Sequence, residues 1–336
     1  MQAIEHPVER LHTALLSTRK VLIETYQQFS RPEMTFLEEG LLPGNLLFSP
    51  ITINSDSDWI PAHPEDPQDF QSFYINTYRR SPSSGRNTIY IQTIGSFGEG
   101  AVVAEQYVEW LKDYCQAFCY GLVVKLLPLV TVASTACSFR INGNTHNLQL
   151  HAGEPLNFLK KRKPRDAFCI VGITMIDLYP RESWNFVFGQ AFLTEGMGVF
   201  SFARYDYHFY ERSYAGPTKK KLKFQKKKIC LTFLTFVTLT NEIGHIFGVR
   251  HCQWLNCKAP ITYGQSDRRP LDLCPICLRK LQSAIGFKIA DRYKASLHWI
   301  EEGADSTAQH SKPTQAFQEY KHWLYMCLLI LEGEKS

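Results

Sequence analysis

The chain reads Asn241-Glu242-Ile-Gly-His245-Ile-Phe-Gly248-Val-Arg-His251-Cys252 over consecutive positions. Positions 241 and 245 are one helical turn apart, so their side chains project from the same face of a helix. Glu242 lies beside that face, where its carboxylate can hold a water molecule on a metal ion. Gly248 can adopt a left-handed backbone conformation and end the helix. The turn that follows would bring His251 back toward a metal held by His245.

These side chains are typical of an open zinc site, in which three protein ligands and one water surround the metal. Zinc lowers the pKa of the bound water, and a neighbouring glutamate takes its proton to make the nucleophile. The sequence His-Glu-x-x-His-x-x-Gly-x-x-His is a metzincin signature, and the chain matches it except for Asn241 in place of the first histidine. We interpret His245 and His251 as catalytic zinc ligands and Asn241 as a weak third ligand. Glu242 is interpreted as the general base.

Four cysteines follow the motif with the spacing of a second metal site. They form the pairs Cys252-x4-Cys257 and Cys274-x2-Cys277, separated by sixteen residues. Four cysteines can close a tetrahedral zinc site and leave no position for a substrate, so we expect this zinc to be structural. The other cysteines lie in apolar contexts and are predicted to be small buried hydrophobic residues. They are Cys115, Cys119, Cys137, Cys169, Cys230 and Cys327.

The composition is that of a soluble globular protein, with 44% hydrophobic and 21% charged residues among 336. The N-terminal sequence lacks the basic segment, apolar core and cleavage site of a signal peptide. Because thiols stay reduced inside the cell, clustered cysteines there indicate a metal before a disulfide. The apolar runs are shorter than the ~20 residues of a membrane-spanning helix. We therefore expect a cytoplasmic protein that is not secreted and has no membrane partner.

A dense run of seven lysines lies between Lys219 and Lys228. Subtracting these seven charges from the net charge of +5 leaves −2. Such a run can attract nucleic acid or serve as a nuclear address, which makes the nucleus a second candidate location. The alternative is a solvated surface loop, and we favour it because the run has no interleaved base-stacking surface; Phe224 is its single aromatic residue. Nucleic acid is therefore not an expected partner.

The chain is predicted to have three parts. Residues 1–84 form an N-terminal extension that is helical near Leu11–Phe29 and irregular after it. Residues 85–302 form the metallopeptidase domain, and residues 303–336 form a linker and a C-terminal helix. Within the domain, strand Thr88–Thr93, helix Val102–Tyr120 and the buried apolar run Leu122–Leu127 indicate a βαβ unit with a parallel strand pair.

Further elements follow from periodicity and apolar runs. The metal-motif helix is expected to begin within Ile229–Thr240, whose threonines repeat at helical spacing. The other predicted helices are Leu156–Lys161, Leu271–Ser283 and Ala316–Leu331. The other predicted strands are Ala167–Thr174, Val187–Phe192 and Gly198–Tyr205.

A metal motif joined to four cysteines at His251–Cys252 resembles the archaemetzincin family, most closely one of its two mammalian paralogues. The similarity extends over nearly the whole chain. It rests on Ser57-Asp58-Trp59-Ile60, Phe139-Arg140, Asn144-Thr145-His146-Asn147-Leu148-Gln149, Asp166–Tyr205 with Asp177-Leu178-Tyr179-Pro180-Arg181, Glu242–Trp254 and Asp267–Cys277.

The resemblance implies an α/β (α+β) metzincin-like fold, with a twisted mixed sheet, an active-site helix and a four-cysteine zinc site. It implies two zinc ions and a peptide or protein substrate. His245 and His251 match catalytic ligands, Glu242 matches the general base and the four cysteines match the second site. It also implies that Gly198–Tyr205 is the edge strand along which a peptide aligns.

Three positions depart from the family pattern. Asn241 replaces a zinc-binding histidine, Ala259 stands where a methionine is expected, and the segment 217–240 is shorter. Two hypotheses therefore remain open. The first is a zinc peptidase with impaired activity, and the second is a non-catalytic relative that keeps a structural zinc and binds peptides or partners.

Overall fold

A computed structural model describes residues 2–56, 58–62, 64–97, 101–210, 235, 238–257, 271–302 and 314–333. The chain forms two compact units. The first, here called the sheet unit, is Arg80–Ile246; the second, the helical unit, joins Met1–Arg79 to Phe247–Ser336. The lysine run, Ala259, the linker 304–313 and most of segment 217–240 lie outside the described residues. The two units end at other positions than the predicted domain boundaries at 84/85 and 302/303, and these boundaries stay predictions.

The sheet unit contains a five-stranded mixed sheet with the order β4-β3-β7-β10-β9. Its parallel strands are β3 (Thr88–Ile94), β4 (Val123–Val130), β7 (Ala167–Thr174) and β10 (Met197–Ser201). The last strand, β9 (Gly189–Phe192), is antiparallel to β10. Helix α6 (Ala101–Phe118) joins β3 to β4, as the predicted βαβ unit requires. The mixed α/β fold class is thereby confirmed.

The edge of this sheet differs from the prediction. Gly198–Tyr205 was expected to be an edge strand, but β10 lies between β7 and β9 and pairs with both. The strand also ends at Ser201, and Ala203–Tyr205 forms a short 3₁₀ helix. The prediction was wrong because β10 already has strand partners on both sides. The outer strand on this side of the sheet is β9.

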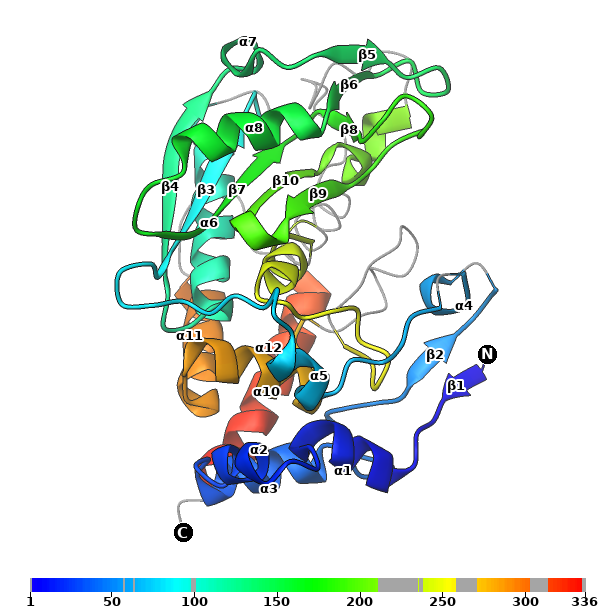
Figure 1. Ribbon diagram of the computed structural model, residues 1–336, viewed down its shortest axis with the longest axis vertical. Coiled ribbons are helices and arrows are strands. Elements are labelled where there is room, and N and C mark those ends of the chain that lie inside the picture. The colour runs from blue at the N-terminus through cyan, green and yellow to red at the C-terminus, as the bar shows by residue number, and fades with distance from the viewer. Residues whose placement is uncertain are drawn as a thin grey trace. The chain divides into compact units, whose positions relative to one another are not determined.

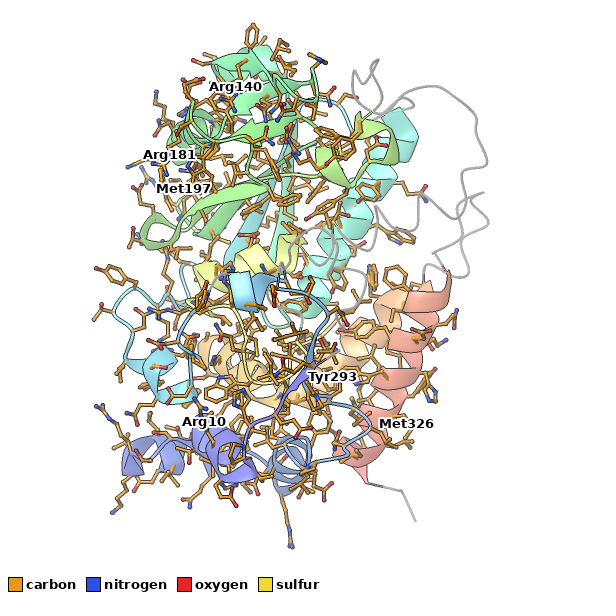
Figure 2. The ribbon with its side chains drawn as sticks, turned by 90° about the vertical axis from the view of Figure 1, so that its right-hand side faces the viewer. Arg10, Arg140, Arg181, Met197, Tyr293 and Met326 are labelled. Carbon is orange, nitrogen blue, oxygen red and sulfur yellow. The ribbon has the colours of Figure 1, made fainter. Side chains whose placement is uncertain are left out.

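Burial explains which strands could be recognised from sequence. Every residue of β3 and β7 is buried, as expected for central strands covered on both faces. Helices α6 and α8 (Gly153–Arg162) lie on opposite faces of the sheet (Figures 1 and 2). The expectation that Leu122–Leu127 is fully buried was wrong, because β4 is the other outer strand and Val123 is exposed.

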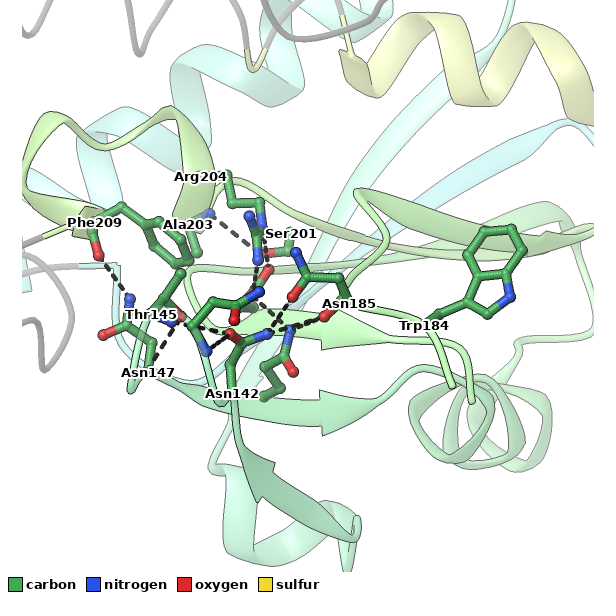
Figure 3. Close-up of polar contacts among 12 residues, drawn as sticks. Asn142, Thr145, Asn147, Trp184, Asn185, Ser201, Ala203, Arg204 and Phe209 are labelled. Carbon is green, nitrogen blue, oxygen red and sulfur yellow. Dashed lines mark hydrogen bonds and ion pairs between the residues drawn. The ribbon is translucent and has the colours of Figure 1, made fainter. Parts of the chain in front are cut away.

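A smaller sheet of three strands has the order β5-β6-β8. Its members are β5 (Phe139–Ile141), β6 (Leu148–His151) and β8 (Asp177–Tyr179). Hydrogen bonds connect it to the turns that follow β8 and β10 (Figure 3). Asn142 donates from Nδ2 to the Asn185 carbonyl oxygen at 3.0 Å, and Asn147 donates to the Phe209 carbonyl oxygen at 2.6 Å.

A buried ion pair completes this network. Arg204 donates from Nε and Nη2 to the two carboxylate oxygens of Asp177, at 2.9 and 2.8 Å. Gln149 donates to the same carboxylate at 2.7 Å. These bonds give a structural role to Asn147, Gln149 and Asp177, which belong to the sequence segments that resemble the family. They hold the 3₁₀ turn Ala203–Tyr205 against the small sheet.

The helical unit consists mainly of helices from both ends of the chain. Strands β1 (Gln2–Ile4) and β2 (Ile51–Ile53) pair antiparallel within it. The N-terminal helices are α1 (Val8–Leu16), α2 (Lys20–Tyr26), α3 (Arg31–Glu39), α4 (Trp59–Ala62) and α5 (Phe70–Ile75). The C-terminal helices are α10 (Pro275–Ile285), α11 (Ile289–Glu302) and α12 (Thr314–Glu332). None of the helices that the structure describes combines the length and apolar character needed to cross a bilayer.

Several parts of the helical unit differ from the prediction. The helix expected near Leu11–Phe29 is divided into α1 and α2, and α4 and α5 lie in the segment that was expected to be irregular. Residues after Phe29 were expected to be irregular, but α3 begins there with a capping box. Ser30 accepts from the Glu33 backbone N–H, and the Glu33 carboxylate accepts from the Ser30 N–H, an arrangement that satisfies the first backbone donors of a helix. Helix α11 was not predicted at all. It contributes Tyr293 (labelled in Figure 2), which packs edge-on against Phe36 and Trp323.

Candidate metal centres

The first part of the metal motif lies on a helix that covers residues 238–246 of the sheet unit. Thr238 is 4% exposed, and its hydroxyl lies 2.9 Å from the Tyr205 hydroxyl. Tyr107 makes a second hydroxyl contact with Thr235, which is also buried. The predicted helical spacing of these threonines is confirmed at 235 and 238. The two tyrosines that hold them were not identified from sequence, because each lies far from the motif along the chain.

Asn241 and His245 project from the same face of this helix. Asn241 Nδ2 lies 3.5 Å from His245 Nε2. Two nitrogen ligands at about 2.0–2.1 Å on a tetrahedral zinc are about 3.4 Å apart. The helix therefore holds the amide group and the imidazole at the spacing of neighbouring zinc ligands. Turning the amide over would place its oxygen where Nδ2 lies.

Glu242 lies beside this pair and is partly buried. Burial raises the pKa of its carboxyl group, whereas His245 and a hydrogen bond from Asn241 act in the opposite direction. A carboxylate accepts a proton more readily as its pKa approaches the working pH. The environment of Glu242 therefore suits a proton acceptor.

The second part of the motif lies in the helical unit. Gly248 has a φ of +93°, and this left-handed conformation ends the helix as predicted. A Cβ at this position would lie 3.2 Å from the Arg79 backbone, so glycine also allows the chain to pass close to Arg79. Three residues later, His251 is partly buried, and its Nδ1 lies 2.8 Å from Glu65 Oε1.

The four cysteines converge at one point of the helical unit. Their sulfur atoms all lie within 4.8 Å of one another, and all four residues are buried. Cys252 Sγ and Cys274 Sγ are 3.6 Å apart, close to the roughly 3.8 Å between sulfurs at 2.3 Å from a tetrahedral zinc. The Cys274 N–H, at the start of α10, donates to Cys257 Sγ at 3.3 Å. The donor set and its spacing fit a zinc ion.

Electrostatics favour a thiolate in this cluster. Hydrogen bonds from Cys257, Cys274 and Cys277 lower the pKa of the Cys252 thiol, and the Lys280 ammonium acts in the same direction. Burial raises the pKa of Cys274. One sulfur is thus stabilised as an anion by its neighbours, which is the form that binds metal.

The remaining cysteines are placed as expected where the structure describes them. Cys115, Cys119, Cys169 and Cys327 are buried, and Cys137 is partly buried. Cys230 lies outside the described residues. Burial raises the pKa of the Cys137 thiol, so this side chain behaves as a small apolar group with an inert thiol.

Comparison with known proteins finds relatives that match almost the whole chain. Archaemetzincin-2 of Homo sapiens is 50% identical over 359 residues, covering 99% of this chain and 100% of that protein. Archaemetzincin-2 of Mus musculus is 50% identical over 358 residues, with the same coverage. The chain belongs to the archaemetzincin family. Archaemetzincin-1 of Homo sapiens is 36% identical over 309 residues, covering 87% of this chain and 62% of that protein.

Two solved structures are similar to part of the chain. The crystal structure of an archaemetzincin from Methanopyrus kandleri has a TM-score of 0.44 and 22% identity, covering 61% of this chain and 99% of that one. A zinc-dependent peptidase from Methanocorpusculum labreanum has a TM-score of 0.42 and 19% identity, covering 57% and 99%. No family model matches the chain. Membership of the archaemetzincins places the chain in a family of zinc metallopeptidases.

Proposed function

We propose that this archaemetzincin hydrolyses peptide bonds at a zinc site weakened by Asn241. The observation that carries the proposal is the pairing of Asn241 and His245 on one helical face, with Nδ2 and Nε2 3.5 Å apart. His245 and His251 would hold the metal through imidazole nitrogens, and Asn241 through its amide oxygen. A neutral amide is a poorer zinc donor than an imidazole.

Glu242 is proposed as the general base. Bound zinc would supply a water of lowered pKa as the nucleophile. Glu242 would orient that water and accept its proton, a role supported by its partly buried position next to the ligand pair. Because burial raises its pKa, Glu242 would accept the proton more readily than an exposed glutamate, and the departing amine nitrogen, a stronger base, would then take this proton.

The substrate is proposed to be a peptide in extended conformation. Strand β9 is the end of the sheet on the side of β10, and an extended peptide can add to such an edge through main-chain hydrogen bonds. This assignment replaces the one expected for Gly198–Tyr205. The residues of β9, Gly189–Phe192, are all partly buried.

We propose that the four cysteines bind a second, structural zinc. The support is the convergence of four buried sulfurs within 4.8 Å of one another, two of them 3.6 Å apart. Because every ligand would be a protein side chain, this site has no position for a substrate. The zinc would instead tie the turn that carries Cys252 and Cys257 to the start of helix α10.

The second candidate is a non-catalytic archaemetzincin that binds peptides or partners. It is favoured by the same pair of residues, because Asn241 Nδ2 can donate to the His245 nitrogen that would otherwise bind the metal. Losing even an outer-shell partner costs about 10- to 100-fold in affinity or activity. Losing a direct ligand is expected to cost more.

A hydrolysis assay separates the two candidates. The wild-type chain is expected to cleave a mixed peptide library slowly, and Glu242→Ala should abolish cleavage without changing the zinc content. Glu195→Ala is the matched control, because it removes one negative charge from the 3₁₀ helix after β9 and not from the metal motif. It should leave the cleavage rate unchanged. Equal rates for wild type and Glu242→Ala would favour the non-catalytic candidate.

A further inference from the structure

The segment that precedes α5 contacts the turn carrying His251. Glu65 Oε1 lies 2.8 Å from His251 Nδ1. Three residues later, the Gln68 side chain makes two bonds to the backbone of the same turn. Its Nε2 donates to the Gly248 carbonyl oxygen at 3.0 Å, and its Oε1 accepts from the Arg250 N–H at 2.9 Å. The segment with Glu65 and Gln68 and the turn with His251 both belong to the helical unit.

Gln68 also contacts the four-cysteine site through its backbone. Its carbonyl oxygen accepts from Trp254 Nε1 at 2.9 Å and from the Lys280 ammonium. Trp254 lies between Cys252 and Cys257 in sequence, and Lys280 lies on α10 three residues after Cys277. Gln68 is 4% exposed and Lys280 is 1% exposed. One buried residue therefore connects the His251 turn with both halves of the cysteine cluster.

The chemistry of the Glu65 contact determines which nitrogen of His251 carries hydrogen. An ionised carboxylate only accepts hydrogen bonds, so the bond requires a hydrogen on Nδ1. In a neutral imidazole the lone pair then lies on Nε2, which is the form that binds metal. A carboxylate on the second nitrogen is a recurrent device for orienting histidine ligands.

We propose that Glu65 and Gln68 are positioning residues for the catalytic metal site. Glu65 sets the tautomer and ring orientation of His251, and Gln68 fixes the backbone that carries this histidine relative to the four-cysteine site. The inference rests on the proposed function, since it takes His251 as a metal ligand. Neither residue is expected to touch the metal or the substrate.

The first test measures the tautomer and does not require a catalytic metal. In the full-length protein labelled with ¹⁵N-histidine, long-range ¹⁵N–¹H spectra distinguish the two neutral tautomers, and His251→Ala identifies the signal. Wild type is expected to show hydrogen on Nδ1. Glu65→Ala should shift the signal toward the other tautomer, whereas Asp66→Ala, an exposed carboxylate next in sequence, should not. Hydrogen on Nε2 in wild type, or no response to Glu65→Ala, would overturn the proposal.

The second test measures metal affinity in the Asn241→His variant, by competition of zinc with a chelator. Glu65→Ala and Gln68→Met are expected to weaken the second zinc by about 10- to 100-fold. Glu65→Gln keeps an acceptor oxygen and should lose less, and Asp66→Ala should lose nothing. Every variant is expected to keep one zinc per chain in the four-cysteine site. This zinc serves as the control that the fold is intact.

The outcomes separate the two proposals. If His251→Ala removes the second zinc while Glu65→Ala and Gln68→Met leave its affinity unchanged, the proposed function stands and the positioning proposal is wrong. If His251→Ala leaves the second zinc in place, or no variant takes it up, the proposed function fails. The tautomer measurement then decides alone whether Glu65 orients the ring.

Discussion

Asn241 Nδ2 lies 3.5 Å from His245 Nε2, one helical turn further along the chain. This distance is at the outer limit of a hydrogen bond, and it joins the amide to the nitrogen that would bind a metal. The two side chains can therefore hydrogen-bond to each other when no metal ion is bound. A histidine at 241 would instead offer a second imidazole on the same face of the helix, so we expect this single side chain to determine how strongly the helix attracts zinc.

The wild-type chain is expected to retain close to one zinc after mild chelation, in the four-cysteine site. Cys274→Ser should remove this zinc and lower the free energy of unfolding, because a structural site gains its metal affinity on folding. Cys137→Ser, at a partly buried cysteine outside the cluster, is the control and should retain the zinc. Elemental analysis and urea titration measure both effects. Two chelator-resistant zinc ions would show that Asn241 is a competent ligand.

Tyr205→Phe is expected to destabilise the sheet unit by about 1 kcal/mol, because it removes the hydroxyl that contacts buried Thr238. Burial raises the pKa of Tyr205, so the hydroxyl keeps its proton and the effect should not vary with pH near neutrality. Tyr210→Phe, at an exposed tyrosine, should have almost no effect. Urea denaturation of both variants gives the comparison, and equal midpoints would contradict a role for Tyr205 in anchoring the motif helix.

Arg204→Met is expected to cost about 3–5 kcal/mol, because it leaves the Asp177 carboxylate buried without its cation. Glu182→Gln breaks an ion pair with Arg140 in which the glutamate is 80% exposed. This control should cost less than about 1 kcal/mol. Thermal or urea unfolding measures the difference. A small effect of Arg204→Met would show that the network in Figure 3 is not needed to hold the 3₁₀ turn.

The lysine run is expected to bind no nucleic acid specifically. Dense like charge with a single aromatic residue, Phe224, and no stacking surface gives weak, salt-sensitive attraction. Fluorescence anisotropy with a labelled oligonucleotide should show binding no tighter than micromolar at physiological salt. Submicromolar binding that disappears when Lys226–Lys228 are changed to alanine would refute this expectation.

Elements with a continuous local pattern could be predicted from the sequence. Ala167–Thr174 is predicted and observed over the same residues, because an unbroken apolar run matches a strand buried on both faces. The start of α3 was missed even though Ser30 and Glu33 form a capping box. The sequence from there to Ser84 is rich in Pro, Asp and Ser, a composition that resembles a loop. The order of β9 and β10 was missed because strand order depends on pairing between distant segments.

The same distinction applies to the candidate site. The offsets among Asn241, Glu242 and His245 lie within one helical turn, so the sequence predicts which residues share a face. The four cysteines were predicted from their spacing, and their convergence is observed. Glu65 and Gln68 were missed because they bond to residues 186 and 180 positions away. No local spacing indicates such contacts.

The most direct test counts zinc and measures peptide hydrolysis in wild type, Asn241→His and the double variant Asn241→His, Glu242→Ala. Asn241→His should bind two zinc ions per chain and cleave peptides much faster than wild type. The double variant should keep both ions and lose the activity, because Glu242 is proposed as a base and not a ligand. Equal zinc content and equal rates in wild type and Asn241→His would contradict the claim that Asn241 limits the catalytic site.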